Sequence, residues 1–179
     1  MPMARSGKVK TKNAGASRRA SRRTLPRHRQ YGAVPVRFAP RSGIEVLLLT
    51  SRGTGRWVIP KGWRMRRRTP AATAEREAFE EAGLKGRLWS RTPIGSYWYR
   101  KEDEDFTGSI LVRVFMLAVD EQKREWPEQS HRETSWFPVE RAASLVKEPG
   151  LARLLRRIPK IVVAQIRAGA PALRRNGGS

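Results

Sequence analysis

The segment from Thr69 to Gly83 carries signals for both ends of a helix. Thr69 followed by Pro70 combines a capping hydroxyl with a residue that is favoured at the first helical position. Gly83 supplies the left-handed residue at which helices commonly end. Small side chains allow close packing, so we predict that this helix lies tightly against a sheet. The small residues that share one narrow face of it are Ala71, Ala74, Ala78 and Ala82.

Apolar runs on both sides of this helix predict the strands of that sheet. In a chain of 179 residues, such strands and helices fit one α/β or α+β domain with tails. The expected strands cover residues 31–38, 45–50, 57–59, 87–99, 109–119 and 136–137. Further helices are expected at 138–145 and 151–166, the second kinked at Pro159, and a basic loop is expected at 61–69.

The formal net charge of +22 belongs mostly to the two ends of the chain. Residues 1–30 hold ten Lys and Arg, residues 151–179 hold seven, and neither end has an acid; the section between holds the other 21 and all 16 acids. We expect a disordered basic arm at 1–29, a folded domain at 30–168 and a flexible tail at 169–179. Such arms would bind nucleic acid or polyphosphate non-specifically through counterion release.

Composition also limits the kinds of site that the chain can build. There is no cysteine, which excludes disulfides and thiolate metal sites. His28 and His131 lie too far apart to suggest a local zinc site, so any metal site should use oxygen ligands. No apolar run could span a bilayer and the N-terminus has no apolar signal core, so we expect a cytoplasmic protein with no membrane partner.

Three glutamates form a separate stripe on the predicted helix. Glu77, Glu80 and Glu81 stand at i, i+3 and i+4, and Arg76 lies one turn before Glu80, with which it can pair. A divalent cation would relieve the repulsion between these carboxylates. Such an ion assists hydrolysis of a phosphoanhydride, while a third carboxylate takes a proton from the attacking water. The glutamates alone also fit an ordinary solvated helix face, since Glu is a good helix former.

The spacing around this helix resembles the Nudix box, G-x5-E-x7-R-E-U-x-E-E-x-G-U. Two positions depart from it: Arg68 stands at the first Glu of the box, and Ala78 is smaller than the usual aliphatic residue. The resemblance extends over about residues 31–165 and implies an α/β fold, a Nudix-type α/β/α sandwich with a mixed sheet flanked by the disordered basic N-terminal arm. The matching residues are Gly62, Arg76, Glu77, Glu80, Glu81, Gly83 and Leu84.

The resemblance also implies roles for the residues of the box in a magnesium-dependent phosphohydrolase. Arg76 would hold the glutamates in place, and the change to Arg68 removes one of its partners. Glu80 would be the general base or a ligand of a second ion, and the sequence leaves both open. The expected ligands of Mg²⁺, or of Mn²⁺, are Glu77, Glu81, Glu80 and a backbone carbonyl of Lys61 or Gly62.

Two further stretches resemble the diphosphoinositol polyphosphate phosphohydrolase branch of the family and its bacterial relatives. They are residues 57–63, and residues 126–137 with Trp126-Pro127-Glu128, Arg132 and Trp136-Phe137. This implies a substrate such as diphosphoinositol polyphosphate, diadenosine polyphosphate or polyphosphate. Cations near the helix would attract such a polyanion, although a solvated basic loop is the alternative. The candidate substrate-binding residues are Lys61, Arg64, Arg66, Arg67 and Arg68, with Arg37, Arg52, Lys101 and Arg113 as further candidates.

Two other functions remain open from the sequence. A Nudix hydrolase that acts on RNA 5′ ends would use the basic arms. A non-catalytic nucleic-acid-binding or ribosome-binding protein could retain a degenerate Nudix domain, but the intact Arg76-Glu77 and Glu80-Glu81 pairs argue against it. Four tryptophans could stack on a base, and we interpret them instead as buried aromatics at strand ends. They are Trp57, Trp63, Trp98 and Trp136.

Overall fold

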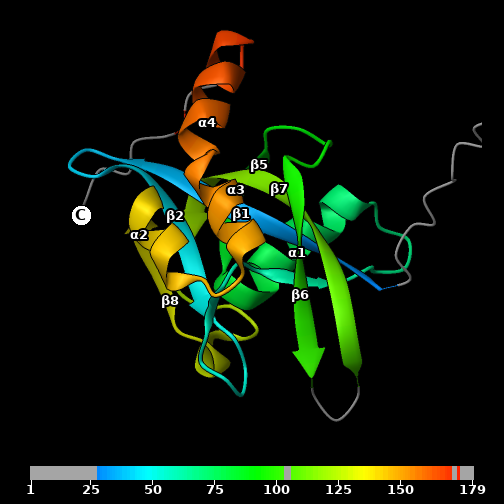
Figure 1. Ribbon diagram of the computed structural model, residues 1–179. Coiled ribbons are helices and arrows are strands. Elements are labelled where there is room, and N and C mark those ends of the chain that lie inside the picture. The colour runs from blue at the N-terminus through cyan, green and yellow to red at the C-terminus, as the bar shows by residue number, and fades with distance from the viewer. Residues whose placement is uncertain (1–27, 103–105, 171–172, 174–179) are drawn as a thin grey trace, which may run out of the picture.

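The computed structural model describes residues 28–102, 106–170 and 173. Its centre is a mixed sheet in which β1 and β7 run parallel and the other paired strands run antiparallel (Figure 1). The main order is β3-β2-β1-β7-β5, with β4 paired to β1, β6 to β7 and β8 to β2. The strands are β1 (Arg29–Ala39), β2 (Gly43–Thr50), β3 (Trp57–Val58), β4 (Lys61–Trp63), β5 (Leu84–Leu88), β6 (Gly95–Glu102), β7 (Thr107–Gln122) and β8 (Thr134–Pro138).

Helices cover both faces of this sheet (Figure 1). Successive residues of a strand point to opposite faces, so Ala33 of β1 packs with α1 in one apolar cluster and Val34 packs with α2, α3 and α4 in the other. The expected α/β/α sandwich with a mixed sheet is confirmed. The helices are α1 (Pro70–Ala82), α2 (Val139–Leu145), α3 (Pro149–Arg156) and α4 (Ile158–Arg167), with a 3-10 turn at Gln129–His131.

Both ends of α1 follow the signals in its sequence. The Thr69 side chain accepts a hydrogen bond from the amide of Ala72 at 3.1 Å, and Pro70 is the first helical residue. Gly83 adopts a φ of 69°, and its amide donates to the carbonyl of Phe79 at 2.8 Å. The alanine face is buried against the sheet, which fixes the direction in which the opposite, polar side of α1 points.

The single strand that we expected at 87–99 is wrong, because the chain forms β5 and β6 with a break between them. The residues on either side of 90–93 still donate backbone hydrogen bonds to β7, and 90–93 form a bend in which the Thr92 amide donates to Ser90 Oγ at 2.9 Å. Pro93 follows, and a proline has no amide proton for a strand ladder. These residues were a turn signal that the apolar flanks concealed.

Two other boundaries differ from the prediction. The first residues of the expected basic loop, 61–63, form β4 and pair with β1. The helix expected at 151–166 is divided at Arg157 into α3 and α4. Pro159 lies in the first turn of α4, where no intrahelical hydrogen bond needs its missing amide proton, whereas one continuous helix would lose a hydrogen bond there.

The described domain begins slightly before the predicted boundary. β1 starts at Arg29, and the amide of Leu111 donates to the carbonyl of His28 at 3.2 Å. The predicted arm up to residue 27 lies outside the described residues, as does most of the predicted tail. No helix in the described part of the chain is long and apolar enough to cross a membrane.

Candidate active site

A cleft of about 730 Å³ opens where α1, β4 and β6 meet the loops around residues 51–56 and 128–132. One wall carries the three glutamates of α1, so the predicted stripe does face a cavity. Among the described residues, the other walls carry six basic residues together with three more glutamates, Glu102, Glu128 and Glu148. The basic residues that line the cleft are Arg52, Arg56, Lys61, Arg64, Lys101 and Arg132.

Glu77 lies directly against the backbone of β4. A Cβ at Gly62 would collide with both oxygens of the Glu77 carboxylate, so any larger residue here would force that carboxylate to move. Burial, assisted by the negative charges of Glu81 and Glu80, raises the pKa of Glu77 to about 7. Positive charge beside Glu77 would therefore be stabilising.

Glu81 is held by hydrogen bonds on both of its carboxylate oxygens. The backbone amide of Lys61 donates to Oε2 at 3.0 Å, and the guanidinium of Arg132 donates to Oε1 at 2.5 Å. Burial raises the pKa of Glu81, while the charges of Lys61 and Arg132 act in the opposite direction. Burial likewise lowers the pKa of the Lys61 ammonium group, against the effect of Glu81. These contacts tie β4 to α1 at the floor of the cleft.

Arg132 joins three segments of the chain and is nearly buried, with 5% of its side chain exposed. Besides Glu81, it donates to Oε2 of Glu128 at 2.7 Å and to the carbonyl oxygen of Thr50 at 3.1 Å. In the sequence, Arg132 stands out only as part of a resembling stretch, because an arginine in a polar loop carries no local signal of burial.

The predicted pair between Arg76 and Glu80 is present. Arg76 Nε donates to Glu80 Oε1 at 2.6 Å, and the guanidinium lies 5.4 Å from the ring centroid of Phe79. Glu80 lines the cleft, whereas Arg76 reaches it from the outer face of α1. Arg76 can therefore orient Glu80 without occupying space in the cleft.

The chemistry of this site fits a hard divalent cation. The available donors are carboxylate oxygens, which Mg²⁺ and Mn²⁺ prefer, and the close approach of Gly62 places backbone next to Glu77. Within the described part of the chain, no three acidic or histidine side chains converge in an arrangement that could hold a metal ion. Arg76 donates a hydrogen bond to one carboxylate oxygen of Glu80, and Arg132 donates one to Glu81. A cation bound to the same oxygens would have to share or replace these contacts.

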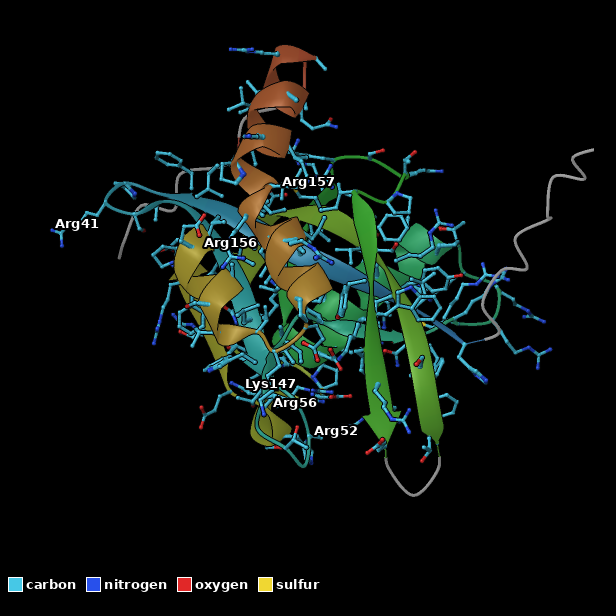
Figure 2. All side chains as sticks on the ribbon, in the orientation of Figure 1. Arg41, Arg52, Arg56, Lys147, Arg156 and Arg157 are labelled. Atoms are coloured by element: carbon cyan, nitrogen blue, oxygen red, sulfur yellow. The ribbon has the colours of Figure 1, made fainter. Side chains whose placement is uncertain are left out.

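The structure divides the predicted basic residues into two groups. Lys61, Arg64, Arg52 and Lys101 line the cleft. Figure 2 shows Arg52 beside Arg56, which belongs to the same loop. Arg37 is instead paired with Glu45 at 2.7 Å. The residues that do not line the cleft are Arg37, Arg66, Arg67, Arg68 and Arg113.

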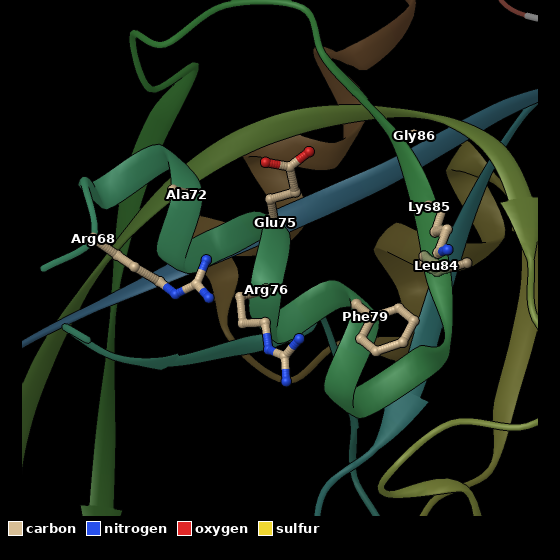
Figure 3. Close-up of a pocket in the computed structure, with 8 residues that line it drawn as sticks. All are labelled: Arg68, Ala72, Glu75, Arg76, Phe79, Leu84, Lys85 and Gly86. Carbon is tan, nitrogen blue, oxygen red and sulfur yellow. The ribbon is translucent and has the colours of Figure 1, made fainter. Parts of the chain in front are cut away.

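The reason for this division is the direction in which each segment faces. The loop before α1 turns its later arginines outward, and Arg68 lines a separate hollow on the outer side of α1 (Figure 3). Arg113 is exposed on β7. Nearness to the catalytic helix in sequence did not indicate which side of that helix a residue would reach.

Residues from distant parts of the chain complete the cleft, and the sequence analysis missed them. Arg56 pairs with Glu148, which precedes α3, at 3.4 Å. The hydroxyl of Tyr99 donates to Gln30 Oε1 at 2.8 Å, and both residues line the cleft. Separations of 92 and 69 residues explain why no local pattern could have indicated these contacts.

The interpretation of the tryptophans as buried is wrong for Trp63 and Trp98, which are 42% and 53% exposed. Trp63 ends the short strand β4 and lines the cleft, with its ring 5.9 Å from that of Phe106. Trp98 alternates with the buried Tyr97 on β6 and therefore faces outward. Trp57 and Trp136 are partly buried.

A family model described as the NUDIX domain matches residues 26–158, which is most of the described chain. The chain belongs to the NUDIX domain family. Its relatives include Nudix hydrolase 12, mitochondrial, from Arabidopsis thaliana, which is 32% identical over 123 residues and covers 66% of this chain and 60% of that protein. Diphosphoinositol polyphosphate phosphohydrolase 3-beta from Bos taurus is 33% identical over 106 residues, covering 58% of this chain and 60% of that protein.

This NUDIX domain spans about 60% of the length of these relatives. Among solved structures, an Ap4A hydrolase of C. elegans aligns with a TM-score of 0.57 and 21% identity, covering 75% of this chain and 98% of that one. The latter likeness shows the fold. The residues of the Nudix box lie in β4, α1 and the start of β5, so the box builds one wall of the cleft.

Proposed function

We propose that this NUDIX domain hydrolyses a phosphoanhydride bond of a highly phosphorylated substrate with the help of Mg²⁺ or Mn²⁺. The observation that carries the proposal is the cleft itself, in which three glutamates of one helix share a cavity with six of the described basic residues. Carboxylates bind a hard cation, and cations bind phosphates, so both requirements of this reaction meet in one cavity.

The residues would divide the work as follows. Glu77 and Glu81, with a backbone carbonyl of Lys61 or Gly62, would hold the cation. When bound, the cation supplies charge neutralisation and orients the leaving group. Glu80 takes the proton of the attacking water or binds a second ion, and the 2.6 Å hydrogen bond from Arg76 keeps Glu80 in position for either role.

The basic wall favours substrates with several phosphates. Arg56 and Lys61 lie deep in the cleft, while Arg52 and Arg64 extend the positive charge towards its mouth. The names of two similar proteins, a diphosphoinositol polyphosphate phosphohydrolase and an Ap4A hydrolase, point in the same direction. Our candidate substrates are therefore diphosphoinositol polyphosphate, diadenosine polyphosphate and polyphosphate. We also propose that the reaction takes place in the cytoplasm.

A second candidate is the 5′ end of RNA. The ends of the chain carry 17 of its 38 basic residues and none of its acids, which suits a long polyanion. Both candidates share the same chemistry at the cleft, and they differ in what extends beyond the phosphates.

Steady-state kinetics on a panel of these substrates tests the proposal. Arg56→Gln should raise KM for the polyphosphorylated substrate by roughly tenfold, because a charged hydrogen bond to phosphate is lost. Arg37→Gln is the matched control, since Arg37 is also paired with a buried glutamate but lies outside the cleft. Equal KM values for both variants would show that the basic residues of the cleft do not bind the substrate. A lack of turnover of every substrate in the panel would overturn the proposed function.

A further inference from the structure

A second hollow of about 510 Å³ lies on the outer face of α1, away from the catalytic cleft (Figure 3). Three cations line it, namely Arg68, Arg76 and Lys85, together with the ring of Phe79. Glu75 is the one acidic residue among the described residues of this lining. The hollow therefore has an excess of positive charge of its own.

The positive groups gather around one aromatic ring. The Arg76 guanidinium lies 5.4 Å from the centroid of Phe79, and the Lys85 ammonium lies 5.9 Å from it. Figure 3 shows Arg68 along the same side of α1. In the described part of the chain, neither Arg68 nor Lys85 forms an ion pair within 4 Å. Glu121 lies opposite Lys85 in the β5–β7 ladder, where a side-chain hydrogen bond and, less strongly, the nearby Lys85 charge lower the pKa of Glu121. Among the described residues, Arg68 is therefore the cation of the hollow with no acidic neighbour of this kind.

Arg76 connects this hollow with the catalytic cleft. A guanidinium carries five N–H donors, and Arg76 uses Nε for Glu80. Its terminal nitrogens make no hydrogen bond to the described residues, so they can receive an anion while Nε stays on Glu80. An anion on the outer face would thus contact the side chain that positions a carboxylate in the cleft.

We propose that the hollow binds an anion that carries two or more phosphates, and that its occupancy is sensed at Glu80 through Arg76. Several phosphates are needed because one exposed ion pair contributes little binding, whereas a diphosphate reaches more than one of the three cations. This site is separate from the cleft and does not depend on hydrolysis.

The test is an NMR titration of the full chain with methylenebisphosphonate, which has no hydrolysable bond, in the presence of EDTA. The backbone amides of Ala72, Phe79 and Gly86 report on the hollow, and the Nε–H signal of Arg76 reports on its link to Glu80. We expect saturable shifts of all four signals with one dissociation constant. Saturation at the three amides with an unchanged Arg76 signal would overturn the link to Glu80.

Two variants of the lining should act in opposite directions. Lys85→Gln should weaken binding about threefold or more, and Glu75→Gln should tighten it about twofold, because each changes one exposed charge of the hollow. Lys160→Gln on α4 removes the same charge far from the hollow and is the control. Equal weakening by Lys85→Gln and Lys160→Gln, or shifts confined to Gly62 and Trp63 in the cleft, would overturn the proposed site.

Discussion

Glu77 of α1 has a raised pKa, mainly because the side chain is partly buried and secondly because Glu81 and Glu80 are close to it. Its raised pKa of about 7 means that the folded chain holds a proton at this carboxyl more tightly than the unfolded chain does. The stability contributed by that proton is complete below the ordinary pKa of 4.5 and is lost as the pH rises through about 7. In protein without a divalent cation, Glu77 therefore opposes folding at alkaline pH.

Replacement of Glu77 by Gln should reveal this effect in the presence of EDTA. At pH 8 we expect Glu77→Gln to be more stable than the wild type by about 1 kcal/mol, a value reduced for the partial exposure of the group. At pH 5 the difference should largely disappear, because the wild-type carboxyl is then protonated. Urea unfolding at both pH values measures it, and an equal difference at pH 5 and pH 8 would show that charge is not the cause.

At the scale of single residues, a contact could be predicted only where its two residues lie close together in the sequence. The Arg76 and Glu80 pair and the stripe of glutamates follow from helical spacing alone. Arg132 and Arg56 reach the cleft from loops far along the chain, and their partners are fixed by tertiary packing. The outward turn of Arg68 belongs to the same class, because a loop has no period from which its direction could be read.

The loop after β7 braces the end of α1. The amide of Lys123 donates to the carbonyl of Gly83 at 2.9 Å, and the amide of Glu128 donates to the carbonyl of Glu80 at 3.1 Å. Between these contacts, the ring of Trp126 lies so close to Gly83 that a Cβ there would be 2.7 Å from it. The brace also carries Arg132, so the end of α1 and the floor of the cleft are held by one loop.

A pair of glycine substitutions isolates this packing. Gly83 and Gly53 both have a positive φ, of 69° and 80°, so alanine should cost about 1 kcal/mol at either from backbone strain. Gly53 has no atom within 4 Å of an added Cβ, whereas Gly83 has the ring of Trp126. We therefore expect Gly83→Ala to lose at least about 1 kcal/mol more than Gly53→Ala in urea unfolding. Equal losses would mean that Trp126 moves aside without cost.

Among the elements, α1 was predictable to its end residues because its cap, proline and stop signal are contiguous in sequence. The sequence did not indicate that 87–99 would divide into β5 and β6, or that β4 would form, since apolar content alone does not show where a strand begins or ends. The parallel pairing of β1 with β7 joins residues about 80 positions apart, which only the assembled sheet determines.

At the scale of the whole molecule, the basic N-terminal segment precedes in sequence every element that builds the cleft. Removal of residues 1–26 should leave kcat on a small substrate nearly unchanged, because α1, β4 and the braces around the cleft all lie within the described domain. The same truncation should weaken RNA retention, and the lost binding should be steeply dependent on salt. The boundary is set before His28, whose carbonyl is hydrogen-bonded to β7.

Paired kinetics and salt-titrated RNA binding on the full and truncated chains check this prediction. Equal RNA binding by the full and truncated chains would show that the arm does not bind polyanions. A collapse of kcat would show that the arm completes the cleft and that the domain begins earlier than we expect.

The central claim is that the glutamates of α1 make the cleft a cation-dependent site of phosphoanhydride hydrolysis. Its most direct test is phosphate release from a polyphosphorylated substrate by wild type, Glu80→Gln and Glu81→Gln, each with Mg²⁺ and after exhaustive chelation. Glu140→Gln is the control, because Glu140 also pairs with an arginine but is exposed on α2. We predict turnover by wild type and control with Mg²⁺ alone, and a loss of about 100-fold or more in both glutamate variants. Full activity after chelation, or a loss below about tenfold in both variants, would contradict the account.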